Sequence, residues 1–125
     1  IGGLLAYQVA MQIIQLIKVD KAVSKSEKAK ALAESGQGLE AIKEWKKDLL
    51  ILPRDQYLKT LDDVVSTYQK LDMPNGVKAA QELIKNSHEF FNMVNNAAKA
   101  TPEVRQAWRV KSNSLRKMVQ ELPES

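Results

Sequence analysis

Apolar residues recur every three or four positions along most of this chain, which is the spacing of one face of an α-helix. No segment alternates apolar and polar residues as a half-buried strand would. The pattern predicts an all-α protein whose four long segments pack as an antiparallel up-and-down four-helix bundle. A chain of 125 residues is long enough to bury one core, so we expect a single domain over residues 1–125.

The first predicted helix runs from about residue 4 to residue 34, and beyond Ile17 it becomes polar and rich in lysine. The following Ser35-Gly36-Gln37-Gly38 contains glycines that permit the left-handed conformation in which helices commonly end. The apolar positions with helical spacing are Leu5, Val9, Ile13, Leu16, Ile17 and Val23.

The second predicted helix begins near Leu39 and meets Pro53, which lacks an amide hydrogen and clashes with the preceding turn. We expect this helix to be kinked or broken at Pro53, as one bent helix or as two. Asp55 suits the positive end of a helix dipole just beyond it. The apolar stripe is Leu39, Ile42, Trp45, Leu49 and Leu52 before the proline, and Tyr57, Leu58, Leu61, Val64, Val65, Tyr68 and Leu71 after it.

A dense turn signal, residues 72–76 (DMPNG), precedes the third predicted helix, about residues 77–100. The fourth helix is expected to begin at Pro102, with Thr101 as its N-cap and Glu103 in its first turn, and to end near residue 122. The expected inward positions are Val77, Ala80, Ile84, His88, Phe91, Val94 and Ala98 in the third helix, and Val104, Trp108, Leu115, Met118 and Leu122 in the fourth.

Residues 1–17 carry no charge, which raises the question of a membrane segment. A span needs about 20 apolar residues, and this run is shorter and contains three glutamines. Gln8, Gln12 and Gln15 fall within about 60° of one another on a helical wheel. A bundle helix with one polar stripe is therefore favoured. Membrane contact through residues 1–17, as the end of an anchor or a targeting remnant, is the alternative.

The sequence offers little for catalysis or for binding a cofactor. It contains no cysteine, which excludes disulfides, thiolate metal sites and cysteine nucleophiles. The one histidine, His88, lies between Ile84 and Phe91 on the expected inward face, which favours a core position over a catalytic one. A haem site formed with Met11 is a weak alternative. Because Lys85 stands three residues before His88, the Glu-x-x-His motif of di-iron bundles is absent. We expect no enzyme, no metal and no cofactor.

The charge pattern favours a protein partner with an acidic surface. Nineteen Lys and Arg against 15 Asp and Glu give a net charge of +4. Acids are interleaved with the bases, whereas nucleic-acid binders concentrate their positive charge, so we expect no nucleic acid partner. For Trp45 and Trp108, core positions are favoured over a binding role. The candidate partner-binding residues are Lys21, Lys25 and Lys28 in the first helix and Lys43, Lys46 and Lys47 in the second, with a plain solvated face as the alternative.

The order and spacing of several residues between about 39 and 122 allow a comparison with a known family. Trp45 is followed by Asp48-Leu49, the pair Tyr57-Leu58 lies a helical distance later, and residues 97–99 (AAK) shortly precede Pro102. The series also contains Leu61, Val65, Trp108, Ser112, Asn113 and Leu122. In this order and spacing, residues 39–122 resemble the PsbQ family. Its members are extrinsic lumenal subunits of photosystem II, also called oxygen-evolving enhancer proteins.

The resemblance implies a basic four-helix bundle without catalytic residues, located in the thylakoid lumen and peripheral to the membrane. It implies docking on photosystem II, where the family helps the manganese cluster of the oxygen-evolving complex to retain calcium and chloride. Two features depart from the family. Plant members carry a proline-rich N-terminal arm where this chain opens on an apolar segment, and Pro53 falls where the family has a continuous helix. An algal or otherwise divergent relative fits these departures better.

Two other functions stay open on the sequence alone. One is an extracytoplasmic ligand-sensing helical bundle of a membrane receptor, which requires membrane spans before residue 1 and after Ser125. The other is a generic helical adaptor. A nucleic-acid-binding version of it would show a steep dependence of affinity on salt, because phosphate contacts release counterions.

Overall fold

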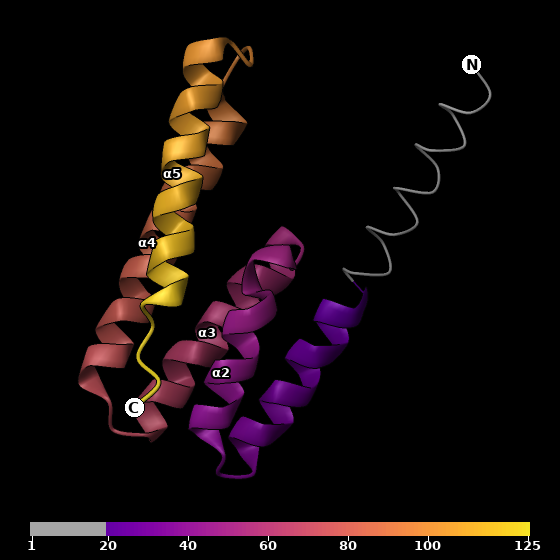
Figure 1. The fold of residues 1–125 in the computed structure, drawn as a ribbon, viewed down its shortest axis with the longest axis vertical. Coiled ribbons are helices and arrows are strands. Elements are labelled where there is room, and N and C mark those ends of the chain that lie inside the picture. Colours follow the sequence, from indigo (N-terminus) through magenta and orange to yellow (C-terminus); the bar gives the residue numbers. More distant parts are fainter. Residues whose placement is uncertain (1–19) are drawn as a thin grey trace, which may run out of the picture. The chain divides into compact units, whose positions relative to one another are not determined.

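The computed structural model describes residues 20–125, and over this range the chain is all-helical. A helical segment, residues 20–34, is followed by α2 (Gly38–Asp48) and by η1 (Leu49–Ile51), a short 3-10 helix. The chain continues through α3 (Arg54–Lys70), α4 (Pro74–Asn96) and α5 (Pro102–Gln120) (Figure 1). The all-α prediction is confirmed for this range. The earlier part of the first predicted helix, with Met11 and the three glutamines, lies outside the described residues.

The described residues divide into two compact units, the first ending at Thr60 and the second beginning at Leu61, with the boundary inside α3. In the first unit, the segment 20–34 ends in the expected glycine turn. Gly36 adopts a φ of +88°, and the Gln37 amide donates to the Leu32 carbonyl at 2.9 Å. Gly38 belongs to the first turn of α2 rather than to the connection. The turn joins segment 20–34 and α2 into a helical hairpin.

Pro53 separates two helices and does not bend one. The α-helical hydrogen bonds of α2 stop at Asp48, and η1 carries the chain to Leu52, which is extended with a ψ of 146°. A residue before proline is pushed towards extended geometry because the proline ring crowds its backbone. The next helix, α3, then begins at Arg54, and the Tyr57 amide donates to the Pro53 carbonyl at 2.8 Å.

In the second unit, α4 and α5 lie side by side, joined by residues 97–101 (Figure 1). The predicted start of α5 is confirmed, because the Thr101 side chain accepts a hydrogen bond from the Val104 amide at 3.2 Å and Pro102 is the first helical residue. The predicted start of α4 was too late. Pro74 opens α4 instead of ending a turn, since proline needs no amide hydrogen in a first turn.

The predicted inward face of α4 is confirmed at Ala80 and wrong towards the C-terminal end. His88 and Ala98 are exposed, and Val94 is 38% exposed. Ser87 is fully buried, and its hydroxyl donates to the Leu83 carbonyl at 2.7 Å. A second series with helical spacing shares Ala80 with the predicted one, and the structure buries this second series. The buried residues of α4 are Gly76, Ala80, Leu83 and Ser87.

On α5, Leu115 and Leu122, which follows the last turn, are buried as predicted, and Val119 joins them. Val104, Trp108 and Met118 are half-buried. The predicted stripe of α3 is confirmed in part, with Tyr57 buried in the first unit and Leu61, Val64 and Tyr68 buried in the second. Its other members, Leu58, Val65 and Leu71, are half-buried.

Tyr68 ties three parts of the second unit together. A Cβ atom added to Gly76 would lie 2.3 Å from Cδ1 of the Tyr68 ring, so the ring packs directly on the backbone of α4. The Tyr68 hydroxyl donates to the Pro123 carbonyl beyond α5. Burial raises the pKa of this hydroxyl above its ordinary value of 10.0, and the carboxylate of Glu124 adds to the increase.

Substituting Gly76→Ala tests the contact with Tyr68. In a helix, alanine alone would stabilise the protein by about 0.5–1 kcal/mol relative to glycine. Here we expect a loss of about 1–3 kcal/mol in the free energy of unfolding, because the methyl group overlaps the ring. Urea unfolding followed by circular dichroism measures the sign. A stabilised variant would show that the ring and the backbone are not in contact.

Substituting Tyr68→Phe tests the bond to Pro123. We expect the variant to lose about 1 kcal/mol at neutral pH, the net value of one hydrogen bond. Because the folded pKa is raised, the unfolded protein ionises first as pH rises past about 10, and the contribution of Tyr68 to stability falls. The difference in unfolding free energy between wild type and variant should therefore shrink above pH 10. A difference independent of pH up to about 11 would contradict a buried hydroxyl.

Candidate functional site

The candidate lysines lie on the hairpin of segment 20–34 and α2, which one buried tryptophan holds together. Trp45 is 3% exposed, and its indole Nε1 donates to the Ser26 carbonyl at 3.1 Å. Ser26 Oγ and Thr60 Oγ1 lie 3.0 Å apart and share a hydrogen bond. The predicted core position of Trp45 is thus confirmed, whereas Trp108 is only half-buried. Segment 20–34, α2 and the middle of α3 therefore meet at Ser26.

Three of the six candidate lysines have acidic partners within the hairpin. Lys25 Nζ lies 3.6 Å from Asp48 Oδ2, and this pair connects segment 20–34 to the end of α2. The other two pairs lie along α2: Lys43 Nζ is 3.5 Å from Glu40 Oε1, and Lys47 Nζ is 2.9 Å from Glu44 Oε1. The hydrogen bond from Lys47 to Glu44 raises the pKa of the lysine.

Lys21 and Lys28 differ from these three. Both are exposed on segment 20–34, and neither forms an ion pair or hydrogen bond with a side chain of residues 20–125. Lys46 is half-buried and makes an interaction of its own. The structure therefore separates the predicted basic set into lysines with local partners and two whose charges are uncompensated within the described chain.

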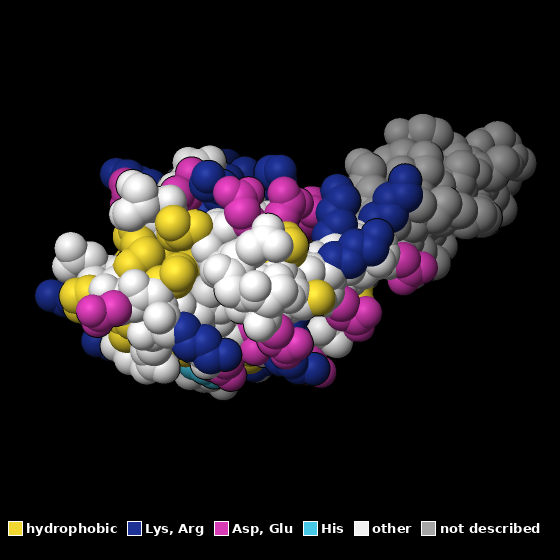
Figure 2. All heavy atoms as spheres, turned by 90° about the horizontal axis from the view of Figure 1, so that it is seen from below, with side chains coloured by type: hydrophobic (Ala, Val, Ile, Leu, Met, Phe, Trp, Pro, Cys, Tyr) yellow, Lys and Arg dark blue, Asp and Glu magenta, His cyan; other side chains and the backbone are white. Residues whose placement is uncertain are grey.

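Charges of both signs are interleaved over the face of the molecule drawn in Figure 2. Exposed pairs of this kind contribute about 0–1 kcal/mol each, because water and salt screen them. Asp48 Oδ2 differs from these exposed groups, because it is buried and has no hydrogen-bond partner. The nearby charge of Lys25 compensates for the lost hydration of this oxygen.

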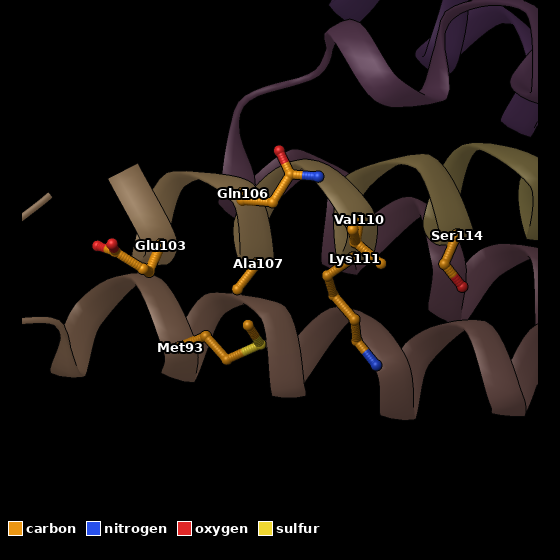
Figure 3. A pocket seen from close by; sticks show the side chains of 7 residues that line it. All are labelled: Met93, Glu103, Gln106, Ala107, Val110, Lys111 and Ser114. Atoms are coloured by element: carbon orange, nitrogen blue, oxygen red, sulfur yellow. The ribbon is translucent and has the colours of Figure 1, made fainter. Parts of the chain in front are cut away.

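The second unit carries a shallow depression of about 590 Å³ on the flank of α4 and α5 (Figure 3). Lys111 reaches from α5 to α4, where its Nζ binds Asn86 Oδ1 at 2.8 Å and Glu89 Oε2 at 2.9 Å. The bond from Lys111 lowers the pKa of Glu89. Lys111 is thus occupied in joining the two helices. The depression is lined by Met93, Glu103, Gln106, Ala107, Val110, Lys111 and Ser114.

Within residues 20–125, no group of three or more His, Asp and Glu side chains is placed to bind a metal ion. The sole histidine is exposed on α4, so the core position predicted for His88 is wrong. Its proposed haem partner, Met11, lies outside the described residues. None of the helices in the described range has both the length and the apolar character needed to cross a membrane.

Comparison with protein-family models, with curated proteins and with solved structures finds no match to this chain. The resemblance to the PsbQ family therefore stays a prediction from the sequence.

Sequence reasoning missed two features, one in each unit. The pairing of Lys25 with Asp48 joins residues far apart in the sequence, so only the closed hairpin reveals it. Val110 is 60% exposed on α5, opposite the buried stripe. Its signal was available in the sequence, as an isolated aliphatic residue on an otherwise polar helix face.

Substituting Trp45→Phe tests whether the indole holds the hairpin. We expect a loss of about 2–3 kcal/mol, which combines one hydrogen bond with the smaller buried ring. Trp108→Phe is the matched control, and it should cost clearly less because Trp108 is half-buried. Thermal and urea unfolding of both variants measure the difference. Equal losses of stability in the two variants would contradict a special role of the Trp45 indole in holding the hairpin.

Proposed function

We propose that this chain is a non-catalytic docking subunit whose basic hairpin binds an acidic surface of a membrane protein complex. The observation that supports it most is the pair Lys21 and Lys28. These lysines are exposed on a helix that Trp45 fixes in place, and no side chain of residues 20–125 neutralises them.

Uncompensated charges suit docking better than paired ones. A lysine that already holds a carboxylate, such as Lys47, gives up that contact before it binds another acid. Lys21 and Lys28 lose only water, and their charges also attract an acidic partner from a distance. Lys25, Lys43 and Lys47 of the hairpin then lie at the edge of the contact and keep their local acidic partners.

The partner follows from the resemblance to the PsbQ family. We propose that the acidic surface belongs to photosystem II, on the lumenal side of the thylakoid membrane, and that binding stabilises the oxygen-evolving complex. The role is steric and electrostatic, because a helical block over the complex limits the access of ions and reductants. It requires no cofactor, no bond-making residue and no nucleic acid.

The proposal includes the arrangement expected from the sequence, in which the helices pack into one antiparallel four-helix bundle. The long helices for it are segment 20–34, α3, α4 and α5, and the short α2 completes the basic hairpin. A compact domain of this length has a radius of gyration of about 14 Å. Small-angle X-ray scattering gives this value directly, and a clearly larger radius would argue against one bundle.

The docking surface can be tested on photosystem II membranes from which the extrinsic subunits have been washed. We expect the wild-type chain to bind at low ionic strength and to be released by about 1 M NaCl, where the screening length falls to about 3 Å. The double variant Lys21→Glu/Lys28→Glu should bind about tenfold more weakly, because two attractions become repulsions. Bound protein is measured by sedimentation with the membranes and immunoblotting.

The matched control reverses two exposed lysines of the second unit, in Lys70→Glu/Lys78→Glu, with the same change in net charge. This control should bind as the wild type does. Equal weakening in both double variants would mean that net charge alone drives binding, and retention of the wild type in molar salt would contradict an electrostatic docking surface.

A further inference from the structure

The outer face of α5 has no partner among the described residues, although its centre is apolar. We define this α5 outer face by the residues within about 60° of Val110 on a helix of 3.6 residues per turn, namely Glu103, Gln106, Ala107, Val110, Asn113, Ser114 and Lys117. All seven are exposed, and Val110 is exposed to 60%. Leu115 and Val119 occupy the opposite side of α5 and are buried. Figure 3 shows the depression that runs along this face, from Glu103 past Val110 to Ser114.

The charges on the α5 outer face are symmetric about Val110. Glu103 lies seven residues before Val110 and Lys117 lies seven residues after it, so each charge is two turns, or about 10.5 Å, away along the axis. If a second α5 packs antiparallel with the two Val110 side chains in contact, Glu103 of each copy faces Lys117 of the other. Between the centre and the charges, Ala107 of each copy faces Asn113 of the other and Ser114 faces Gln106, so each small side chain leaves room for an amide side chain.

We infer that the α5 outer face binds the same face of a second copy of this chain, antiparallel, about a two-fold axis at Val110. A two-fold contact uses one surface twice and requires that surface to be self-complementary. The sequence of signs, acid then apolar then base, fulfils this requirement. It opposes the parallel arrangement, which would place Glu103 against Glu103 and Lys117 against Lys117.

The neighbouring side chains fit this occupant. Met93 of α4, which is exposed to 37%, lines the same depression and widens the apolar centre on one flank. Lys111 brings no unpaired cation to that flank, because Asn86 and Glu89 hold its Nζ. Lys117 has a competing acid in Glu121, but at 3.9 Å and with both side chains mostly exposed this pair is easily exchanged.

The contact is small, so the association should be weak. Its apolar centre is well below the roughly 800 Å² per partner of a stable interface, and we expect a dissociation constant on the order of 100 µM. Sedimentation equilibrium of the purified full chain, from about 10 µM to 1 mM, should show a monomer–dimer equilibrium in this range. A monomer throughout this range would overturn the inference.

Charge reversal identifies the geometry. Glu103→Lys and Lys117→Glu should each raise the dissociation constant about fivefold or more, since each change turns two attractions into repulsions. The double variant Glu103→Lys/Lys117→Glu should return to within about twofold of the wild type, because both pairs are restored with exchanged signs. Arg116→Glu is the control, as it reverses a neighbouring exposed charge on another side of α5 and should have no effect. Failure of the double variant to recover would exclude the antiparallel register.

The absence of cysteine from the sequence permits a second readout of the two-fold axis. Val110→Cys should form a disulfide-linked dimer under mild oxidation, because the two side chains meet on the axis within the reach of an S–S bond. Arg116→Cys should stay monomeric under the same conditions. Equal cross-linking of both would indicate random collision. These experiments use no photosystem II membrane and no lysine of the hairpin, so their outcome is independent of the proposed docking function.

Discussion

The missing amide hydrogen of Pro53 decides how the first half of this chain folds. Because the helix stops at Asp48 and resumes only at Arg54, the chain can bring Thr60 back to segment 20–34. Ser26 then binds both α2 and α3. Its carbonyl accepts a hydrogen bond from the Trp45 indole, and its hydroxyl shares one with Thr60. A continuous helix through residue 53 would carry Thr60 onward, away from Ser26. Of the two arrangements expected at Pro53, one bent helix or two helices, the structure has two, and the turn between them brings Thr60 to Ser26.

The proposed function depends on the hairpin of segment 20–34 and α2. On an isolated helix, these lysines would only form a solvated surface without a fixed position. In the hairpin, Trp45 and the Lys25–Asp48 pair hold segment 20–34 against α2, so the lysines have fixed positions. In the folded hairpin, Lys25, Lys43 and Lys47 are paired with acidic side chains, whereas Lys21 and Lys28 are exposed. The proposed binding surface is therefore narrower than the six lysines that the sequence suggested.

The sequence predicted local chemistry well and the phase of packing less well. Gly36, Thr101 and Pro102 were assigned their conformations correctly, because a turn glycine, an N-cap and a first-turn proline act through their own backbone. His88 was placed wrongly, since the buried face of α4 is the one on which the Tyr68 ring packs against Gly76. That contact joins different helices, and no spacing within one helix encodes it. For the candidate site, the lysines were found from spacing, but their partners required the fold.

The central claim is that the chain acts by presenting Lys21 and Lys28 to an acidic neighbour. The most direct measurement is zero-length carboxyl-to-amine cross-linking of the native protein in its own membranes, followed by mass spectrometry. The account predicts amide bonds from Lys21 and Lys28 to Asp or Glu residues of lumenal photosystem II subunits. Cross-links that arise only from lysines of α4 and α5, or partners outside photosystem II, would contradict it.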